Sequence, residues 1–77
     1  MDISKGTLQN NLFLLRAERK WTQKYVAEQL DVTRQTINSL ESNKYNPSLM
    51  LAFEIAQLFE KRIDEIFIYG KKGKGEA

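Results

Sequence analysis

The chain has 77 residues, which favours a single domain with a small hydrophobic core. It contains no cysteine and no histidine, which excludes disulfides, thiolate metal sites and catalytic groups built on histidine. The net charge of +2 is unevenly distributed: residues 5–44 carry seven basic and four acidic side chains, whereas residues 45–70 carry two basic and four acidic ones. A basic front half is a weak indication of an anionic partner.

The ends of the chain give little sign of targeting. No run of about 18 apolar residues is present, and residues 1–11 lack the apolar core of a signal peptide. We therefore expect no membrane span and a cytoplasmic location. Residues 71–77 are polar and rich in lysine and glycine, which predicts a flexible basic tail after a folded domain of residues 1–70.

Apolar residues recur at helical spacing along most of the chain, and Pro47 is the only proline. A first helix is indicated by Leu8, Leu12 and Leu15, which would share one face. Threonine or serine, both good N-cap residues, precedes three further apolar stripes. The five predicted helical segments are residues 8 or 10 to 20, 23–30, 34–42, 49–59 and 63–66.

A short β-prone segment, Phe67 to Tyr69, ends at Gly70. A lone strand needs a partner, and residues 6–9 are the only free segment. We therefore expect a small two-stranded antiparallel ribbon formed by the N- and C-terminal segments. The predicted fold class is all-α, a compact five-helix domain with this ribbon added.

Residues 22–42 have the properties of a tight helix-turn-helix. Ala27 is small where the two helices approach each other, and Asp31 can accept the positive φ that the turn requires. Arginine, glutamine and asparagine have forked donors and acceptors that match base edges in the DNA major groove. The outward face of the second helix of the pair carries Arg34, Gln35, Asn38, Ser39 and Ser42.

This pattern resembles the Cro/cI-type, or XRE-like, helix-turn-helix family of prokaryotic and phage transcription regulators, over about residues 10–67. The resemblance is carried by Leu12, Leu15, Arg16, Thr22, Gln23, Ala27, Leu30, the run 32–37, Leu40, Glu41, the run 47–49, Ala52, Ile55 and Ala56. It implies a lambda-repressor-like domain that binds double-stranded DNA. It further implies a homodimer on an inverted repeat, acting as a repressor at the nucleoid.

The resemblance also implies roles for individual positions. Base reading would fall to Arg34, Gln35, Asn38 and Ser39. Phosphate contacts are expected from Thr22, Gln23, Lys24, Thr36, Asn43, Lys44, Tyr45 and Asn46, and Gln23 would also brace the recognition helix. A buried structural ion pair is expected between Arg16 and Glu41. Self-association is expected through Leu49, Ile66, Phe67, Ile68 and Tyr69.

The sequence leaves other interpretations open. An antitoxin-like or adaptor protein on the same fold is the main alternative, although only the short tail could serve as a toxin-binding extension. An enzyme has little support, because no nucleophile–base pair can be assembled without histidine or cysteine. Trp21 fits a core position better than a base-stacking one, and the tail lysines are either solvated or a nonspecific DNA arm. We expect no cofactor, no metal and no small-molecule ligand.

Overall fold

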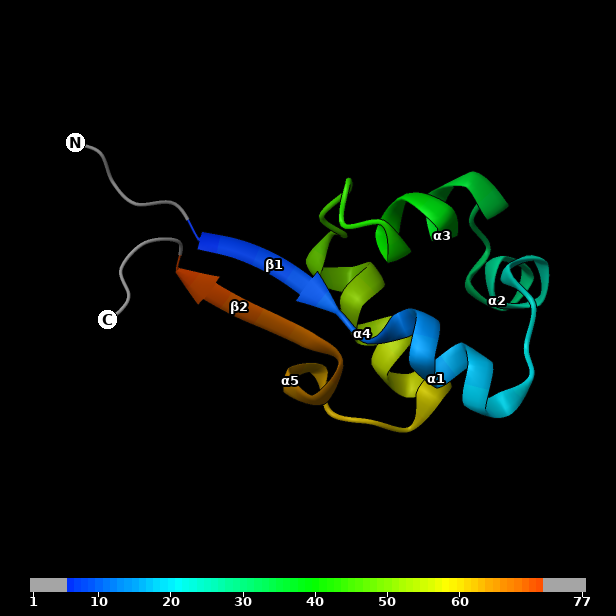
Figure 1. Cartoon of the computed structure of the whole chain (residues 1–77). Helices are drawn as coiled ribbons and strands as arrows, with labels where there is room; N and C mark the ends of the chain where they lie inside the picture. The colour runs from blue at the N-terminus through cyan, green and yellow to red at the C-terminus, as the bar shows by residue number, and fades with distance from the viewer. Residues whose placement is uncertain (1–5, 72–77) are drawn as a thin grey trace.

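In the computed structural model, the described residues 6–71 form five helices and one two-stranded antiparallel sheet (Figure 1). In chain order the elements are β1 (Gly6–Asn10), α1 (Leu12–Arg19), α2 (Gln23–Leu30), α3 (Arg34–Glu41), α4 (Leu49–Phe59), α5 (Ile63–Ile66) and β2 (Phe67–Lys71). The predicted fold class, five helices with a terminal ribbon, is confirmed. Within the described residues, none of these helices has the length and apolar character needed to cross a membrane.

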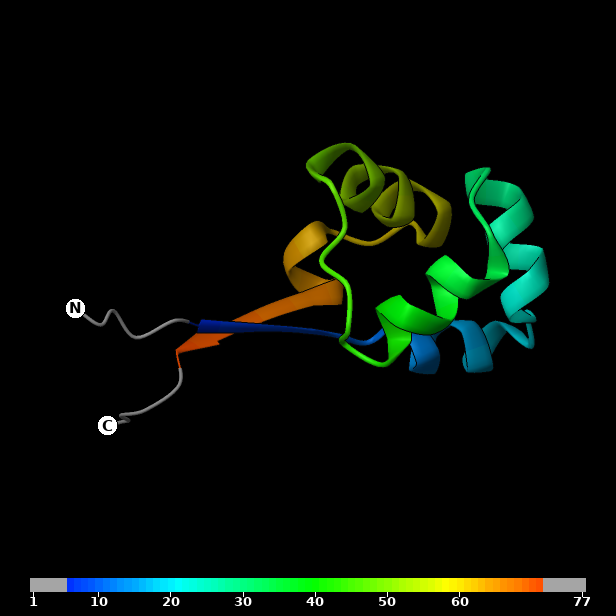
Figure 2. The same ribbon diagram turned by 90° about the horizontal axis from the view of Figure 1, so that it is seen from above.

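The ribbon joins the two ends of the described chain. Its register places Leu8 opposite Tyr69 and Asn10 opposite Phe67. Figures 1 and 2 show that the ribbon extends away from the helical body on the side where α3 ends. The molecule is therefore elongated, with extents of 41 × 20 × 19 Å.

The start of the first helix differs from the prediction. Helix α1 begins at Leu12, and Leu8 lies in β1 opposite Tyr69. The prediction that Leu8 belongs to the helical stripe is therefore wrong. A spacing of four residues places two side chains on one face of a helix, but it also places them on one face of a strand. Pairing with β2 decides between the two conformations.

Other boundaries shift by one or two residues: α1 ends at Arg19 rather than at residue 20, and the strands end at Asn10 and Lys71 rather than at residues 9 and 69. Strand β2 includes Lys71, so the folded domain extends one residue further than predicted. The rest of the predicted flexible tail lies outside the described residues. Helix α3 ends at Glu41, and Ser42 is its C-cap rather than its last residue.

The three N-cap residues and the turn residue Asp31 have the predicted conformations. The hydroxyls of Thr22, Thr33 and Ser48 each accept a hydrogen bond from the backbone N–H three residues later, at 2.9, 3.1 and 3.1 Å. These bonds satisfy donors that have no partner within the helix. Asp31 and Asn43 lie in the left-handed region, with φ of 59° and 60°. Local chemistry thus fixes where α2, α3 and α4 begin and where the chain turns.

The core lies where the inner faces of the helices and the root of the ribbon meet. Trp21 is partly buried and packs against this core, with its ring centroid 5.3 Å from that of Phe59. This packing confirms the predicted core role of Trp21. The fully buried side chains are Leu12, Val26, Ile37, Leu40, Ile55, Phe59 and Ile66.

Leu14 and Leu15 are neighbours on α1 in opposite environments, with exposed fractions of 58% and 8%. We expect Leu15→Ala to lower the free energy of unfolding by about 2–5 kcal/mol, because it removes buried methyl groups and leaves a cavity. Leu14→Ala, the matched control, should change it by less than about 0.5 kcal/mol. Urea unfolding of both variants at one protein concentration measures the difference. Equal losses would contradict the assigned buried face of α1.

Candidate nucleic-acid interface

Helix α3 separates a buried face from an exposed polar face. Arg34, Gln35 and Asn38 are exposed and Ser39 is partly exposed, whereas Ile37 on the other face is fully buried. The structure therefore brings the four predicted base-reading side chains to one surface. The major groove of B-DNA is wide enough to admit an α-helix that presents such a surface.

Two open hollows adjoin this face. One has a volume of about 660 Å³ and is lined by Arg16, Lys20, Trp21, Thr22, Gln23, Lys24 and Arg34. The other has a volume of about 290 Å³ and is lined by Thr33, Gln35, Thr36, Ser39, Lys44 and Tyr45. Five lining residues are cationic and none is acidic. Arg34 borders the first hollow and Gln35 the second. The first hollow holds four of the cationic side chains, of which Arg16 is paired with Glu41, and the second holds one, Lys44.

Six of the eight residues predicted to contact phosphate line these hollows. Asn43 and Asn46 line neither hollow, but they belong to the loop that carries Lys44 and Tyr45. The backbone turns into this loop at Asn43, whose left-handed conformation ends the run of α3. The loop therefore lies directly after the recognition helix, as the sequence predicts.

An ion pair holds α3 against α1. Arg16 Nε lies 2.7 Å from Glu41 Oε2 and Arg16 Nη2 lies 3.0 Å from Glu41 Oε1, so the contact is bidentate. Arg16 Nη1 also donates to the Trp21 carbonyl at 3.0 Å. The side chains are only 14% and 7% exposed. The hydrogen bond to Glu41 raises the pKa of Arg16 above its ordinary value despite burial.

Gln23 connects α2 to the same ion pair. Its Nε2 donates to Glu41 Oε1 at 3.0 Å and lies 3.3 Å from Asn38 Oδ1 on the exposed face of α3. Both amide hydrogens of Gln23 therefore have acceptors on α3. The side chain braces α3 in the free protein, and a phosphate near the start of α2 would meet the backbone N–H groups of its first turn.

Sequence reasoning did not find the role of Asn10. Its Nδ2 donates to the Leu40 carbonyl at 2.8 Å and lies 3.4 Å from Asn43 Oδ1, while its Oδ1 accepts from the Leu12 N–H at 3.0 Å. An asparagine close to the start of a predicted helix indicates a hydrogen bond to the first turn of that helix. The neighbouring sequence gives no indication that Asn10 also contacts residues 30 or more positions away.

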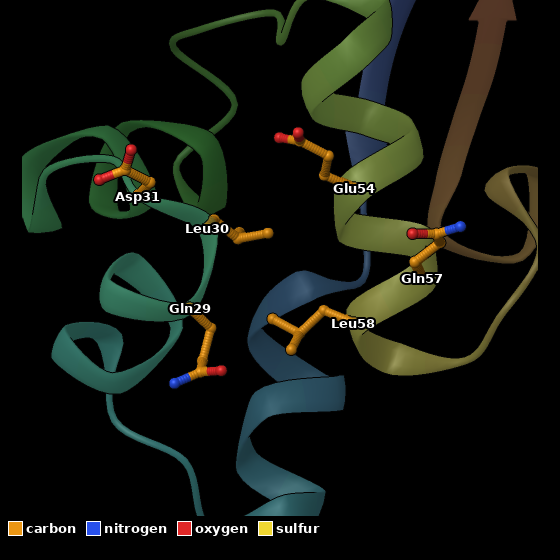
Figure 3. A pocket seen from close by; sticks show the side chains of 6 residues that line it. All are labelled: Gln29, Leu30, Asp31, Glu54, Gln57 and Leu58. Atoms are coloured by element: carbon orange, nitrogen blue, oxygen red, sulfur yellow. The ribbon is translucent and has the colours of Figure 1, made fainter.

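A third hollow lies between the end of α2 and α4 and has a different character (Figure 3). Its volume is about 380 Å³, and it is lined by Gln29, Leu30, Asp31, Glu54, Gln57 and Leu58. Leu30 and Leu58 point into it, and its two charged side chains are carboxylates. Negative charge disfavours a phosphate there. Among residues 6–71, no group of three or more acidic side chains is arranged to hold a metal ion.

Comparison with known proteins agrees with this geometry. A helix-turn-helix family model matches residues 12–66, which is most of the chain. The chain belongs to the helix-turn-helix family of transcriptional regulators, of the XRE type. It is 48% identical over 62 residues to an HTH-type transcriptional regulator of Methanocaldococcus jannaschii, covering 80% of this chain and 94% of that protein.

Solved structures extend the comparison. A Bacteroides fragilis protein superimposes with a TM-score of 0.72 at 28% identity, over 79% of this chain and 98% of that one. The transcriptional regulator VanUg has the same fold, with a TM-score of 0.74 at 19% identity over 94% of this chain and 96% of that one. A more distant curated relative is the antitoxin HipB of Escherichia coli, 36% identical over 57 residues, or 74% of this chain and 61% of HipB.

The surface expected to mediate self-association is only partly exposed in this helix-turn-helix protein. Leu49, Ile68 and Tyr69 are 72%, 47% and 64% exposed. Ile66 and Phe67 are buried in the core of the single chain, and this corrects the expectation for these two side chains. The reason is that the short α5 turns its last residue inward, where its carbonyl accepts a hydrogen bond from the N–H preceding α1.

Helix α4 exposes two apolar side chains that sequence reasoning left out. Met50 and Phe53 are both exposed, and Phe53 lies one helical turn beyond Leu49. The signal was present in the sequence, because Leu49 and Phe53 are four residues apart and off the stripe of buried residues. Because the apolar stripe of α4 is broad, the sequence alone does not show which of its apolar side chains are exposed.

Removing one partner of the buried pair should destabilise the fold. We expect Glu41→Leu to lower the free energy of unfolding by roughly 3–5 kcal/mol, because it leaves the Arg16 guanidinium buried and unpaired. Arg16→Met combined with Glu41→Leu should recover a large part of this loss. The exposed pair Arg62–Asp64 has the same 2.7 Å separation and provides a control, with Asp64→Leu expected to cost less than about 1 kcal/mol. Urea unfolding compares the variants, and similar losses at both pairs would show that burial is irrelevant.

Proposed function

We propose that this protein binds double-stranded DNA sequence-specifically by inserting α3 into the major groove. The observation that carries the proposal is the exposed polar face of α3, flanked by one hollow with several cationic lining residues and a second with one, Lys44, and with no acidic lining residue in either. Side chains over the groove specify sequence, and contacts to the phosphates on either side fix register. Membership of a family of transcriptional regulators supports the same function.

Base reading is assigned to the exposed face of α3. Arg34 and Gln35 open the helix, where a side chain reaches deepest into the groove. Arginine pairs with O6 and N7 of guanine, and glutamine pairs with N6 and N7 of adenine. Asn38 and Ser39 follow one turn later on the same side and would contact the adjacent base pairs.

Phosphate contacts are assigned to both sides of this helix. On one side, Thr22, Gln23 and Lys24 form the start of α2, where free N–H groups and the helix dipole favour an anion. On the other side, the loop after α3 contributes. The residues proposed to contact phosphate there are Thr36, Asn43, Lys44, Tyr45 and Asn46.

We further propose that the protein acts as a homodimer on an inverted repeat. Two copies related by a twofold axis would place their recognition helices about 34 Å apart, in successive turns of the major groove. Exposed Leu49, Ile68 and Tyr69 support a self-association surface that includes the ribbon and the start of α4. A dimer covering such a site would exclude polymerase from it, so we propose a repressor that acts on chromosomal DNA in the cytoplasm.

An antitoxin is the second candidate, and the similarity to HipB is the observation that favours it. The two candidates differ in the partner they require, because a regulator needs only DNA whereas an antitoxin needs a second protein. Selection of bound sequences from a random DNA pool separates them. Enrichment of a palindrome supports the regulator and its symmetry together, and no enrichment at moderate salt favours the antitoxin.

Substitutions on α3 and in the loop should affect binding differently. We expect Arg34→Ala and Gln35→Ala each to weaken binding to the selected sequence by roughly 1–3 kcal/mol per half-site and to relax preference at one base pair. Lys44→Ala should weaken binding about equally on all sequences, because phosphate contacts carry no sequence information. Gln29→Ala, beside the acidic hollow, is the control and should bind normally. Titration against selected and scrambled DNA measures these effects, and normal binding by both α3 variants contradicts the assigned face.

Charge placed on the proposed dimer surface should separate the subunits. We expect Leu49→Asp and Tyr69→Asp each to weaken self-association by more than roughly tenfold, because a carboxylate would be desolvated between the two copies. Leu14→Asp on α1 introduces the same charge at an exposed leucine outside this surface and should leave association unchanged. Analytical ultracentrifugation across micromolar concentrations measures the three variants. Dissociation caused only by Leu14→Asp would move the interface to α1.

A further inference from the structure

Asn10 joins three parts of the molecule at one point. Its backbone ends β1, directly opposite Phe67 in the ribbon. Its Oδ1 accepts from the Leu12 N–H at 3.0 Å and so caps α1, while its Nδ2 donates to the Leu40 carbonyl at 2.8 Å. The same Nδ2 lies 3.4 Å from Asn43 Oδ1. The root of the ribbon, the start of α1 and the end of α3 therefore meet at a single side chain.

The atoms that Asn10 contacts lie where α3 becomes the following loop. The Leu40 carbonyl accepts both the Asn10 amide and the backbone N–H of Asn43, at 2.8 and 3.0 Å. Asn43 is the residue in the left-handed conformation that directs the chain out of the helix. A donor at this carbonyl fixes the last turn of α3 and the direction of the loop together.

We propose that Asn10 is a positioning residue for DNA binding, an inference that rests on the proposed function. It contacts no DNA itself in this assignment. Its Nδ2 holds the recognition helix and the loop of residues 43–46 in the relative position that lets both meet one duplex. Because the backbone of Asn10 belongs to β1, the same contact ties the geometry of the recognition helix to the ribbon.

The two ends of the Asn10 amide have separable roles. Oδ1 caps α1, which is a structural role, whereas Nδ2 reaches α3 and the loop. Asn10→Asp keeps the oxygen that caps α1 and removes the donor. Asn11 provides a matched control, because its Nδ2 donates to the Glu65 carbonyl at 3.2 Å. Asn11→Asp thus removes a donor from the same corner of the chain at a contact with α5.

The experiment compares three acidic variants of the full chain on the DNA selected by the parent protein. Asn10→Asp should raise the dissociation constant roughly three- to thirtyfold. Asn11→Asp should remain within about twofold of the parent. Gln9→Glu, at an exposed position of β1, measures the effect of the added charge alone and should also remain within about twofold.

A second readout distinguishes positioning from general loss of stability. In Asn10→Asp the amide NMR signals of residues 43–46 should shift, and their hydrogen exchange should become faster, while signals of α5 stay in place. Asn11→Asp should show the opposite pattern. If Asn10→Asp does not fold, Asn10→Ser replaces it, because a serine hydroxyl can still cap α1 but is too short to reach Leu40. The same measurements then apply.

The outcomes separate the inference from the function on which it rests. Binding by the parent together with equal affinities for Asn10→Asp and Asn11→Asp overturns the positioning role and leaves the proposed function intact. Weakened binding by Asn10→Asp without a change at residues 43–46 also overturns it. Failure of the parent to select any DNA overturns the proposed function itself.

Discussion

The ion pair between Arg16 and Glu41 is the contact on which the orientation of α3 depends. Hydrophobic burial brings helices together but is not directional, whereas a bidentate pair is satisfied in only one relative placement. Here Glu41 of α3 receives Arg16 from α1 and Gln23 from α2. The carboxylate is 7% exposed, so it must keep these donors in the folded state. Three helices are thereby held in one arrangement, with the polar face of α3 left outward.

Charge is separated across this arrangement in a way that suits a polyanion. The two hollows beside the start of α3 contain only cationic and neutral side chains, whereas the hollow between α2 and α4 carries Asp31 and Glu54 (Figure 3). A small net charge can therefore coexist with an uneven distribution of charged side chains over the surface. The modest total of +2 conceals this distribution.

The ribbon pairs the first and last strands of the small domain, and it also presents an exposed surface. A two-stranded sheet is marginal by itself, and here it is anchored at its root, where Phe67 is buried and Asn10 reaches α3. Its outer part presents Ile68 and Tyr69 to solvent. The ribbon also leaves the body on the side where α3 ends (Figure 1), so a second copy bound there would lie beyond the end of the recognition helix. The ribbon, which carries two residues of the proposed dimer surface, is thus connected to α3 through Asn10.

The sequence by itself determined the features that depend on nearby residues. The N-caps at Thr22, Thr33 and Ser48, the left-handed turn at Asp31 and the helical stripes of α2, α3 and α4 follow from chemistry within a few positions. Five helices could therefore be predicted, as could an outward face of α3 bearing Arg34 and Gln35. The prediction of the ribbon rests on a different ground, because residues 67–69 need a strand partner and residues 6–9 are the free segment.

Only the tertiary structure decided the features that depend on distant partners. The sequence around Leu8 is compatible with a helix or a strand, and pairing with β2 decides for the strand. Ile66 and Phe67 are apolar and could equally belong to an interface or to the core, and the direction of α5 places them in the core. The contact of Asn10 with Leu40 exists because folding brings two segments 30 residues apart to one corner. Periodicity and propensity report which face of an element is apolar. They do not report which element, in the same chain or in another, covers that face.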